Sequence, residues 1–213
     1  MAVARRTVGT GAGGARAEKS AARREAILAA ALDEFSARGF AAARLDDVAA
    51  RAGVAKGTIY LHFSDKEALF QELIRTVMGP LVATLETTAA VDLPLRVVAE
   101  QVVDLFVREI LGTRRKDVIR LIITEGPRFP QLAEFHYREV LSRALAAVRG
   151  LLRHAIDRGE IAGDALVRFP QLLIAPGIVA IIWSGLFDRF ATLDVAALMR
   201  AHLDLIFGTG GTS

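Results

Sequence analysis

The stretch from Leu45 to Phe63, LDDVAARAGVAKGTIYLHF, constrains the fold of this chain more than any other stretch. Two short helical patterns, residues 45–52 and 56–62, are separated by only three residues, a connection that suits two helices crossing at a steep angle. Gly53 can adopt the positive φ that ends the first helix, and Ala49 is small enough to let the two helices approach. The stretch therefore predicts a helix-turn-helix.

The second helix of this motif is expected to present a narrow outer surface of hydrogen-bond donors and small groups. Val54 and Ile59 are expected to lie beneath it. Phosphates and base edges suit such a surface, so we assign DNA contacts here. Contacts mainly to phosphate are expected from Thr58, Tyr60, His62 and Lys66, and contacts nearer to base edges from Lys56, Gly57 and Leu61.

These residues, at these spacings, resemble a known family. The run through Gly39-Phe40, Asp46-Asp47-Val48-Ala49, Ala52-Gly53-Val54, Lys56-Gly57-Thr58-Ile59-Tyr60, His62-Phe63 and Lys66-Glu67-Ala68-Leu69 resembles the N-terminal signature of the TetR/AcrR family of transcriptional repressors. The resemblance implies an all-α fold of about nine helices, in which a three-helix DNA-binding domain is fused to a helical ligand-binding and dimerisation domain. It also implies a homodimeric, sequence-specific transcriptional regulator, a repressor that a small-molecule effector releases from its operator.

The chain departs from the family pattern at two helix starts. Ala43 and then Arg44 stand where members usually carry a Thr or Ser, and Ala55 stands where they usually carry a Ser. Loss of such a cap costs a helix about 1 kcal/mol when nothing replaces it. Asp46 and Asp47 still suit the positive end of the first helix dipole, and Arg44 can supply a phosphate contact of its own. We therefore add Arg44 to the predicted DNA contacts.

The positive charge is concentrated at the amino end. The chain carries a net charge of +3, but residues 1–24 alone carry six basic side chains against Glu18, so the rest of the chain is slightly acidic. Residues 1–20 are rich in Gly, Ala and Arg without an apolar repeat, which predicts a disordered basic tail. Two interpretations of this tail remain open: it tracks phosphates or a minor groove, or it is a solvated extension without a role.

Composition argues against several classes of site. The absence of Cys excludes a disulfide framework, a thiolate metal site and a Cys nucleophile. The four histidines lack metal-ligand spacing, and no nucleophile elbow or recognisable carboxylate pair is present. We predict no metal, cofactor or catalytic residue, and no enzyme. The alternatives are a ligand-independent architectural or partner-binding protein and, more remotely, a small-molecule enzyme.

Helical patterns punctuated by Pro and Gly occupy the remainder of the chain. We predict a DNA-binding domain at 21–70, an effector-binding and dimerisation domain at 71–207 and a flexible C-terminus at 208–213. Within them, helices are expected at 25–38, 64–78, 94–112, 114–125, 131–158, 164–190 and 195–207. Ser64, with Glu67 three residues on, predicts a capping box, and Gly79-Pro80 predicts a break.

Residues 172–187, LLIAPGIVAIIWSGLF, form the most apolar run. At 16 residues, interrupted by Pro176-Gly177 and flanked by charges, the run is too short for a membrane span. A helix that is apolar on every side must be covered, and a second copy of the chain is the expected cover. We predict a homodimer through 164–190 and 195–207, which would place two recognition helices about 34 Å apart on palindromic operator DNA. The expected location is the cytoplasm, at the nucleoid when DNA is bound.

By resemblance, the C-terminal domain is expected to bind a small apolar or amphipathic effector among its central helices. The segment 120–140 is similar to the C-terminal domain of a subset of AcrR-type regulators. Aromatic residues with a few polar tips make adaptable apolar sites, although each can equally belong to the core or to an interface. The candidates are Phe106, Phe129, Phe135, His136, Tyr137, Trp183 and Phe187.

Overall fold

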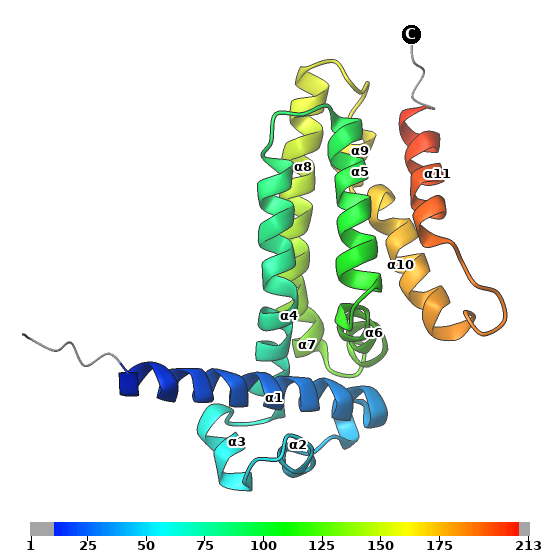
Figure 1. The fold of residues 1–213 in the computed structure, drawn as a ribbon. Helices are drawn as coiled ribbons and strands as arrows, with labels where there is room; N and C mark the ends of the chain where they lie inside the picture. The colour runs from blue at the N-terminus through cyan, green and yellow to red at the C-terminus, as the bar shows by residue number, and fades with distance from the viewer. Residues whose placement is uncertain (1–10, 209–213) are drawn as a thin grey trace, which may run out of the picture. The chain divides into compact units, whose positions relative to one another are not determined.

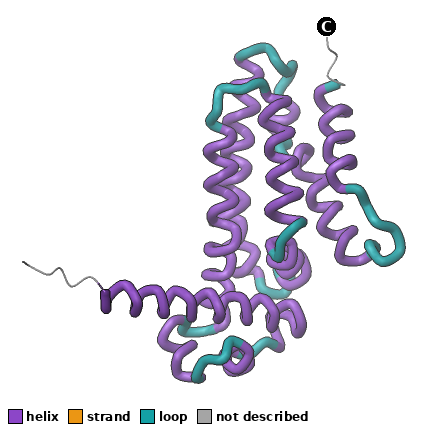
Figure 2. Tube along the Cα trace, viewed as in Figure 1, coloured by secondary structure: helices purple, strands orange, loops and turns teal. Residues whose placement is uncertain are grey.

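A computed structural model describes residues 11–208 of the chain. Within this range the chain folds into helices joined by loops, without a β-strand (Figures 1 and 2). The all-α fold is therefore confirmed. The chain divides into two compact units, one ending at Leu73 and the other beginning at Ile74.

The first unit consists of α1 (Gly11–Ala42), α2 (Leu45–Arg51), α3 (Lys56–His62) and the beginning of α4 (Lys66–Ala89). Its core contains three aromatic rings, those of Phe35, Phe40 and Phe70, whose centroids lie 5.4–5.5 Å apart. Gly39 interrupts the helical geometry of α1 with a φ of 73°, a value that a glycine adopts without strain. The chain therefore turns at Gly39, as its sequence predicts.

The amino end of α1 differs from the prediction. Residues 11–20 belong to the helix, where the sequence predicts part of a disordered tail. Ala, Arg, Lys and Glu in this segment favour helix, and this local preference extends α1 towards the amino end. Residues 1–10 and 209–213, which the prediction also assigns to the tail and the flexible C-terminus, lie outside the described residues.

Helix α4 also differs from its predicted bounds. Its first turn is capped by Asp65, whose Oδ1 accepts a hydrogen bond from the backbone N–H of Ala68 at 2.7 Å, and not by Ser64. The helix then continues through Pro80 to Ala89. A proline inside a helix costs about 3 kcal/mol. The apolar face continues past it, with Met78 and Val82 both buried, and this burial offsets the cost.

The second unit contains the remaining helices. Helix α5 (Leu95–Leu105) passes directly into the π-helical segment η1 (Phe106–Leu111), and α6 (Arg115–Glu125) follows. Helix α7 (Pro130–His136), the π-helical segment η2 (Tyr137–Leu141) and α8 (Ser142–Asp157) form one continuous rod, as the sequence predicts for 131–158. The unit ends with α9 (Ala165–Arg168), α10 (Gln171–Leu186) and α11 (Val195–Phe207).

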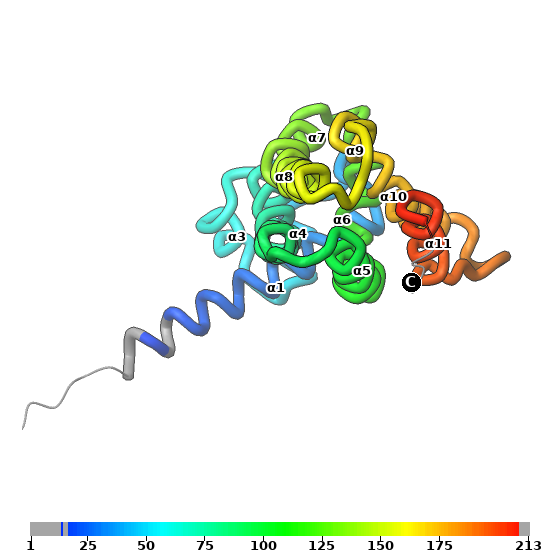
Figure 3. The backbone as a smooth tube through the Cα atoms, turned by 90° about the horizontal axis from the view of Figure 1, so that it is seen from above, coloured from blue at the N-terminus to red at the C-terminus, as the bar shows by residue number. Residues whose placement is uncertain are grey.

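Within the second unit, α5 and α8 run beside the later part of α4 (Figures 1 and 3). Their shared core includes Leu95, Val98 and Leu152, which are fully or almost fully buried. Helix α11 packs on α5 and α10, and Arg96 of α5 forms an ion pair with Asp204 of α11. Across residues 11–208, no helix has the length and apolarity needed to cross a lipid bilayer.

Candidate functional site

Helices α2 and α3 form the predicted helix-turn-helix. Gly53 has a φ of 66°, and Val48, Ala49 and Ile59 are almost completely buried, so the motif packs tightly on its inner side. Neither Arg44 nor Ala55, the residues before α2 and α3, provides a side-chain cap. Both predictions, the positive φ and the missing caps, are confirmed.

A buried carboxylate fixes α2 against α1. Glu34 has a side chain that is only 1% exposed, and its two oxygens lie 3.2 Å from guanidinium nitrogens of Arg38 and Arg51. Arg38 also donates to Asp47 at 3.1 Å. Replacing either Arg38 or Arg51 would leave the buried carboxylate of Glu34 with uncompensated charge, which is strongly destabilising. These contacts hold the first helix of the motif in place.

The outer surface of α3 carries the predicted DNA-contact residues. Leu61 is 85% exposed and Tyr60 is 48% exposed, so two large side chains lie next to each other in the chain on the solvent side of this helix. A methyl group added at Gly57 would meet no heavy atom within 4 Å, so the surface beside this residue is open. Thr58 and His62 are half-buried at the edges of this surface, and Arg44 is exposed before α2.

Lys56 is paired inside the motif. Its Nζ donates to Oδ2 of Asp46 at 2.7 Å. The hydrogen bond from Lys56 lowers the pKa of Asp46, and the same hydrogen bond raises the pKa of Lys56. The sequence prediction placed Asp46 only at the helix dipole and missed this partner, because the two residues belong to different helices whose crossing decides the contact.

Lys66 is also engaged within the first unit. Its Nζ donates to the backbone oxygens of Phe40 and Ala41 at 2.9 and 2.8 Å, and it lies 4.9 Å from the centroid of the Phe40 ring. These oxygens belong to the end of α1, where carbonyl groups lack helical partners. Lys66 therefore holds the end of α1 next to the start of α4.

A cavity of about 210 Å³ lies within the second unit, and we call it the ligand cavity. Residues from α4, α5, η1, α6, η2, α8, α10 and α11 contribute to it, together with His136 at the end of α7. Its lining consists of Met78, Leu81, Val82, Leu85, Val102, Leu105, Phe106, Ile110, Ile119, His136, Val140, Leu141, Ala144, Leu173, Ile174, Gly177, Ile178, Ile181 and Met199. Only two of the candidate effector contacts, Phe106 and His136, line this cavity.

His136 is the polar residue of the ligand cavity. Its Nδ1 is buried and has no hydrogen-bond partner among the described residues. Burial lowers the pKa of His136 from 6.5 to about 4, so the imidazole is neutral at pH 7. The cavity is thus apolar apart from one neutral group that can donate or accept a hydrogen bond.

The other five candidate effector contacts lie outside the lining of the ligand cavity. Phe135 is buried, with the guanidinium groups of Arg75 and Arg138 at 4.8 and 5.5 Å from its ring centroid. Trp183 donates its indole N–H to the backbone oxygen of Ala191 at 2.7 Å and lies edge-to-face with Phe187. Tyr137 is exposed, and Phe129 lies next to Arg128.

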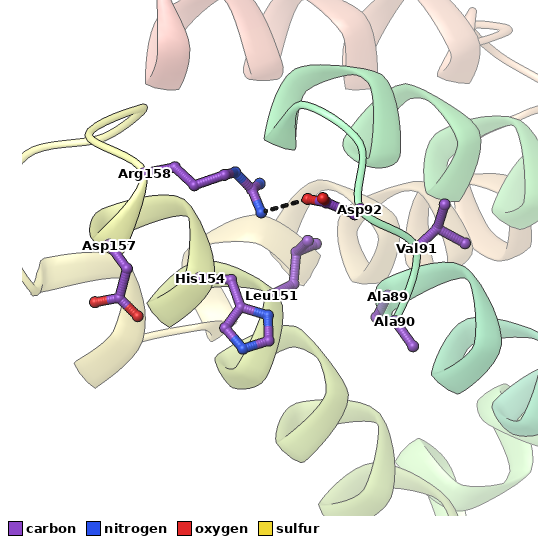
Figure 4. A pocket seen from close by; sticks show the side chains of 8 residues that line it. All are labelled: Ala89, Ala90, Val91, Asp92, Leu151, His154, Asp157 and Arg158. Carbon is purple, nitrogen blue, oxygen red and sulfur yellow. Dashed lines mark hydrogen bonds and ion pairs between the residues drawn. The ribbon is translucent and has the colours of Figure 1, made fainter.

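A second hollow, of about 370 Å³, lies where the end of α4 meets the end of α8 (Figure 4). It is more polar, with His154 and Arg158 among its lining residues. Arg158 is already paired with Asp92 at 3.4 Å and with Glu160 at 2.5 Å. Among the described residues, no group of three or more His, Cys, Asp or Glu side chains is placed to hold a metal ion.

Comparison with known proteins identifies both units. Residues 27–73 match the family model "Bacterial regulatory proteins, tetR family", and residues 94–197 match the model "Tetracyclin repressor-like, C-terminal domain". The HTH-type transcriptional repressor BepR of Brucella suis biovar 1 is 34% identical over 154 residues, which cover 68% of this chain and 72% of the relative. The HTH-type transcriptional regulator SrpR of Pseudomonas putida is 30% identical over 138 residues, which cover 65% of this chain and 63% of the relative.

Among solved structures, the transcriptional regulator FadR from Bacillus subtilis in complex with stearoyl-CoA has a similar fold. The TM-score is 0.70 at 24% identity, over 87% of this chain and 98% of that chain. A helix-turn-helix with an exposed second helix, joined to a second helical unit, fits the class of DNA-binding transcriptional regulators to which these relatives belong. The chain belongs to the TetR family of bacterial regulatory proteins.

Proposed function

We propose that this protein is a homodimeric repressor, that α3 of each subunit enters a major groove of a palindromic operator, and that a small apolar effector in the ligand cavity releases it from DNA. The observation that carries the DNA-binding part is the exposure of Tyr60 and Leu61 on a helix whose inner residue, Ile59, is fully buried. A surface of this kind has little role in the stability of the first unit, and its shape suits a groove of duplex DNA.

The proposed contacts follow from the position of each side chain. We assign Arg44, Thr58, Tyr60 and His62 to phosphates, and Lys56, Gly57 and Leu61 to base edges. Lys66 uses two of its three donors on the carbonyls of α1, which leaves one for a phosphate. Its larger contribution is to fix the end of α1, the helix on which α2 of the motif packs.

The proposed dimer interface is formed by α10, the loop after it and α11. Large apolar side chains are exposed along these segments, and clustering of such side chains on neighbouring helices supports a protein partner. A second copy of the chain is the simplest cover, since twofold symmetry also gives the spacing of about 34 Å between half-sites. The exposed residues are Leu172, Ile178, Val179, Ile182, Leu186, Phe187, Phe190 and Leu205.

The proposed effector response uses the ligand cavity. A compound can shift the protein away from its DNA-binding state only by as much as its affinities for the two states differ. Residues from both π-helical segments line the cavity, and such segments are frequent at functional sites. The protein would act on DNA in the bacterial cytoplasm, without a cofactor and without a catalytic residue.

Selection of bound DNA from a random pool tests this function. We expect a palindrome whose half-site centres lie about one helical turn, or a multiple of it, apart. The two tyrosines of the chain provide a matched pair of variants, since Tyr60 and Tyr137 are 48% and 56% exposed. Tyr60→Ala should weaken operator binding at least about tenfold, the loss expected for a contact worth 1.4 kcal/mol. Tyr137→Ala should leave it unchanged.

Three results would count against the proposal. Selection without any recurring sequence would favour a ligand-independent architectural protein. Equal operator affinity of the Tyr60→Ala and Tyr137→Ala variants would remove α3 from the DNA surface. A monomer that binds DNA in a sequence-indifferent way would contradict both the dimer and the operator.

A further inference from the structure

We propose that the ligand cavity takes a compact, uncharged and largely apolar compound with one hydroxyl group that pairs with His136, and that it rejects carboxylates and ammonium compounds of the same size. This inference rests on the proposed function, because it names the chemical class of the effector for that same site. It follows from the charge, the hydrogen bonding and the size of the cavity.

The lining of the ligand cavity excludes charge. Apart from His136, every lining residue is apolar, and no Asp, Glu, Lys or Arg is among them. An ion that leaves water for such surroundings loses its hydration and gains no counter-ion. A neutral compound avoids this loss and gains from burial of its apolar surface.

His136 adds the requirement for a single polar group. Among the described residues its Nδ1 has no hydrogen-bond partner, and a buried polar atom without a partner destabilises the state that holds it. His136 lines the cavity, so a ligand group that reaches Nδ1 would remove this penalty. The neutral imidazole has one donor and one acceptor nitrogen, and a hydroxyl can match either of them, whereas a carbonyl or an ether can match only the donor. A hydroxyl is therefore the group that fits.

The size of the cavity limits the carbon skeleton. A dry apolar cavity of about 150 Å³ binds benzene, so the 210 Å³ found here suits about two fused rings. One wall is formed by the ring of Phe106 against Gly177, where an added Cβ would lie only 2.9 Å from Phe106 Cζ. The absence of a side chain at Gly177 thus lets an aromatic face line the cavity.

Three probes of nearly equal size separate the contributions in the full-length protein at pH 7. They are 1-naphthol, which is neutral and has a hydroxyl, naphthalene, which lacks a polar group, and 1-naphthoate, which is an anion. By titration calorimetry we expect 1-naphthol to bind about tenfold more tightly than naphthalene and at least about a hundredfold more tightly than 1-naphthoate. Equal binding of 1-naphthoate and 1-naphthol, or no binding of any probe, would overturn the inference.

Variants locate the effect. His136→Leu should bring the affinities for 1-naphthol and naphthalene together, while naphthalene binding is retained, which shows that the cavity is still formed. Ala144→Leu, which fills part of the cavity, should weaken both compounds, and Tyr137→Ala, next to His136 but outside the lining, should change neither. A preference for 1-naphthol that survives His136→Leu would contradict the pairing.

The proposed function is tested separately in the same preparations. Operator binding without any probe reports whether the protein is a sequence-specific regulator at all, and it does not depend on the charge of the effector. If operator binding is present and 1-naphthoate releases the protein as well as 1-naphthol does, only the inference about the ligand class fails. If sequence-specific binding is absent, the proposed function fails.

Discussion

The Nζ of Lys56 lies 2.7 Å from Oδ2 of Asp46, and this ion pair joins the first turn of α3 to the first turn of α2. Lys56 is 67% exposed, so solvent and salt screen the pair. In the free protein, the cation proposed to reach base edges is therefore occupied by a carboxylate of the same motif. DNA must compete with Asp46 for Lys56, which penalises binding to any sequence that offers Lys56 no good acceptor.

The first prediction concerns this competition. Asp46→Asn should strengthen binding to non-specific DNA several-fold and steepen its salt dependence by about one unit of slope, because one more cation becomes available to phosphates. Operator binding should gain less, so that the ratio of specific to non-specific affinity falls. Fluorescence anisotropy at several salt concentrations measures both. Asp164→Asn makes the same change of charge in the second unit and should have no effect.

The second prediction uses the open surface at Gly57. Gly57→Ala should stabilise the first unit, since Gly within a helix is about 1 kcal/mol less favourable than Ala and the new methyl group meets nothing. Operator affinity should nevertheless decrease, because the methyl group lies on the surface that approaches DNA. Urea unfolding and a gel-shift assay report the two effects. An undiminished operator affinity would mean that DNA does not come close to Gly57.

The third prediction concerns the pH dependence of stability. The folded pKa of His136, about 4, lies below its unfolded value of 6.5. As the pH falls through 6.5, the unfolded state binds a proton that the folded state does not bind, so stability is lost until about pH 4. The full loss is about 3 kcal/mol, at 1.36 kcal/mol for each pKa unit. Above pH 6.5 this residue should contribute no pH dependence.

Replacement of His136 isolates that effect from the titration of the carboxylates. The free energy of unfolding of His136→Leu should exceed that of the wild type, and the difference should widen from pH 7 to pH 4. Denaturant titrations at several pH values measure it. A difference in unfolding free energy that stays constant from pH 7 to pH 4 would show that folding does not lower the pKa of His136.

The fourth prediction tests the dimer. Val179 on α10 and Val91 in the loop after α4 are 50% and 48% exposed. Substitution of each by Glu therefore compares two equally exposed positions, one inside the proposed interface and one outside it. Val179→Glu should dissociate the dimer and weaken operator binding with it, because charge would be buried in an apolar interface. Val91→Glu should do neither. Sedimentation at micromolar concentration separates the two, and a dimer that survives Val179→Glu would place the interface elsewhere.

The sequence predicts the local features of this fold well. The positive φ of Gly53, the burial of Ile59 and the bounds of α11 all depend on residues close together in the chain. By contrast, α4 runs through Pro80 because an apolar face continues beyond it, and packing of that face decides against the local preference. Breaks at proline are predictable only where no tertiary contact outweighs them.

The candidate sites differ in the same way. The proposed DNA-contact surface lies mainly on one short helix, α3, so its exposed residues follow from helical spacing. The ligand cavity draws on six separate helical rods, and aromatic character alone picks out only Phe106 and His136. Most of its lining is aliphatic, with the same composition as the surrounding core, and Gly177 contributes by lacking a side chain. Only the arrangement of the helices distinguishes such residues from ordinary core.

In the two π-helical segments, η1 and η2, each backbone hydrogen bond spans one residue more than in the α-helices that adjoin them, and residues of both segments line the ligand cavity. An α-helix turns by about 100° per residue, because 3.6 residues complete a turn. Conversion of a π-helical segment to α-helix shifts the register by one residue, so it would rotate the adjoining stretch of helix by about 100°. In both rods, the change between α-helical and π-helical winding lies at the wall of the cavity. A compound that binds the α-helical and π-helical forms of η1 or η2 with different affinities would therefore rotate the helix that adjoins the segment.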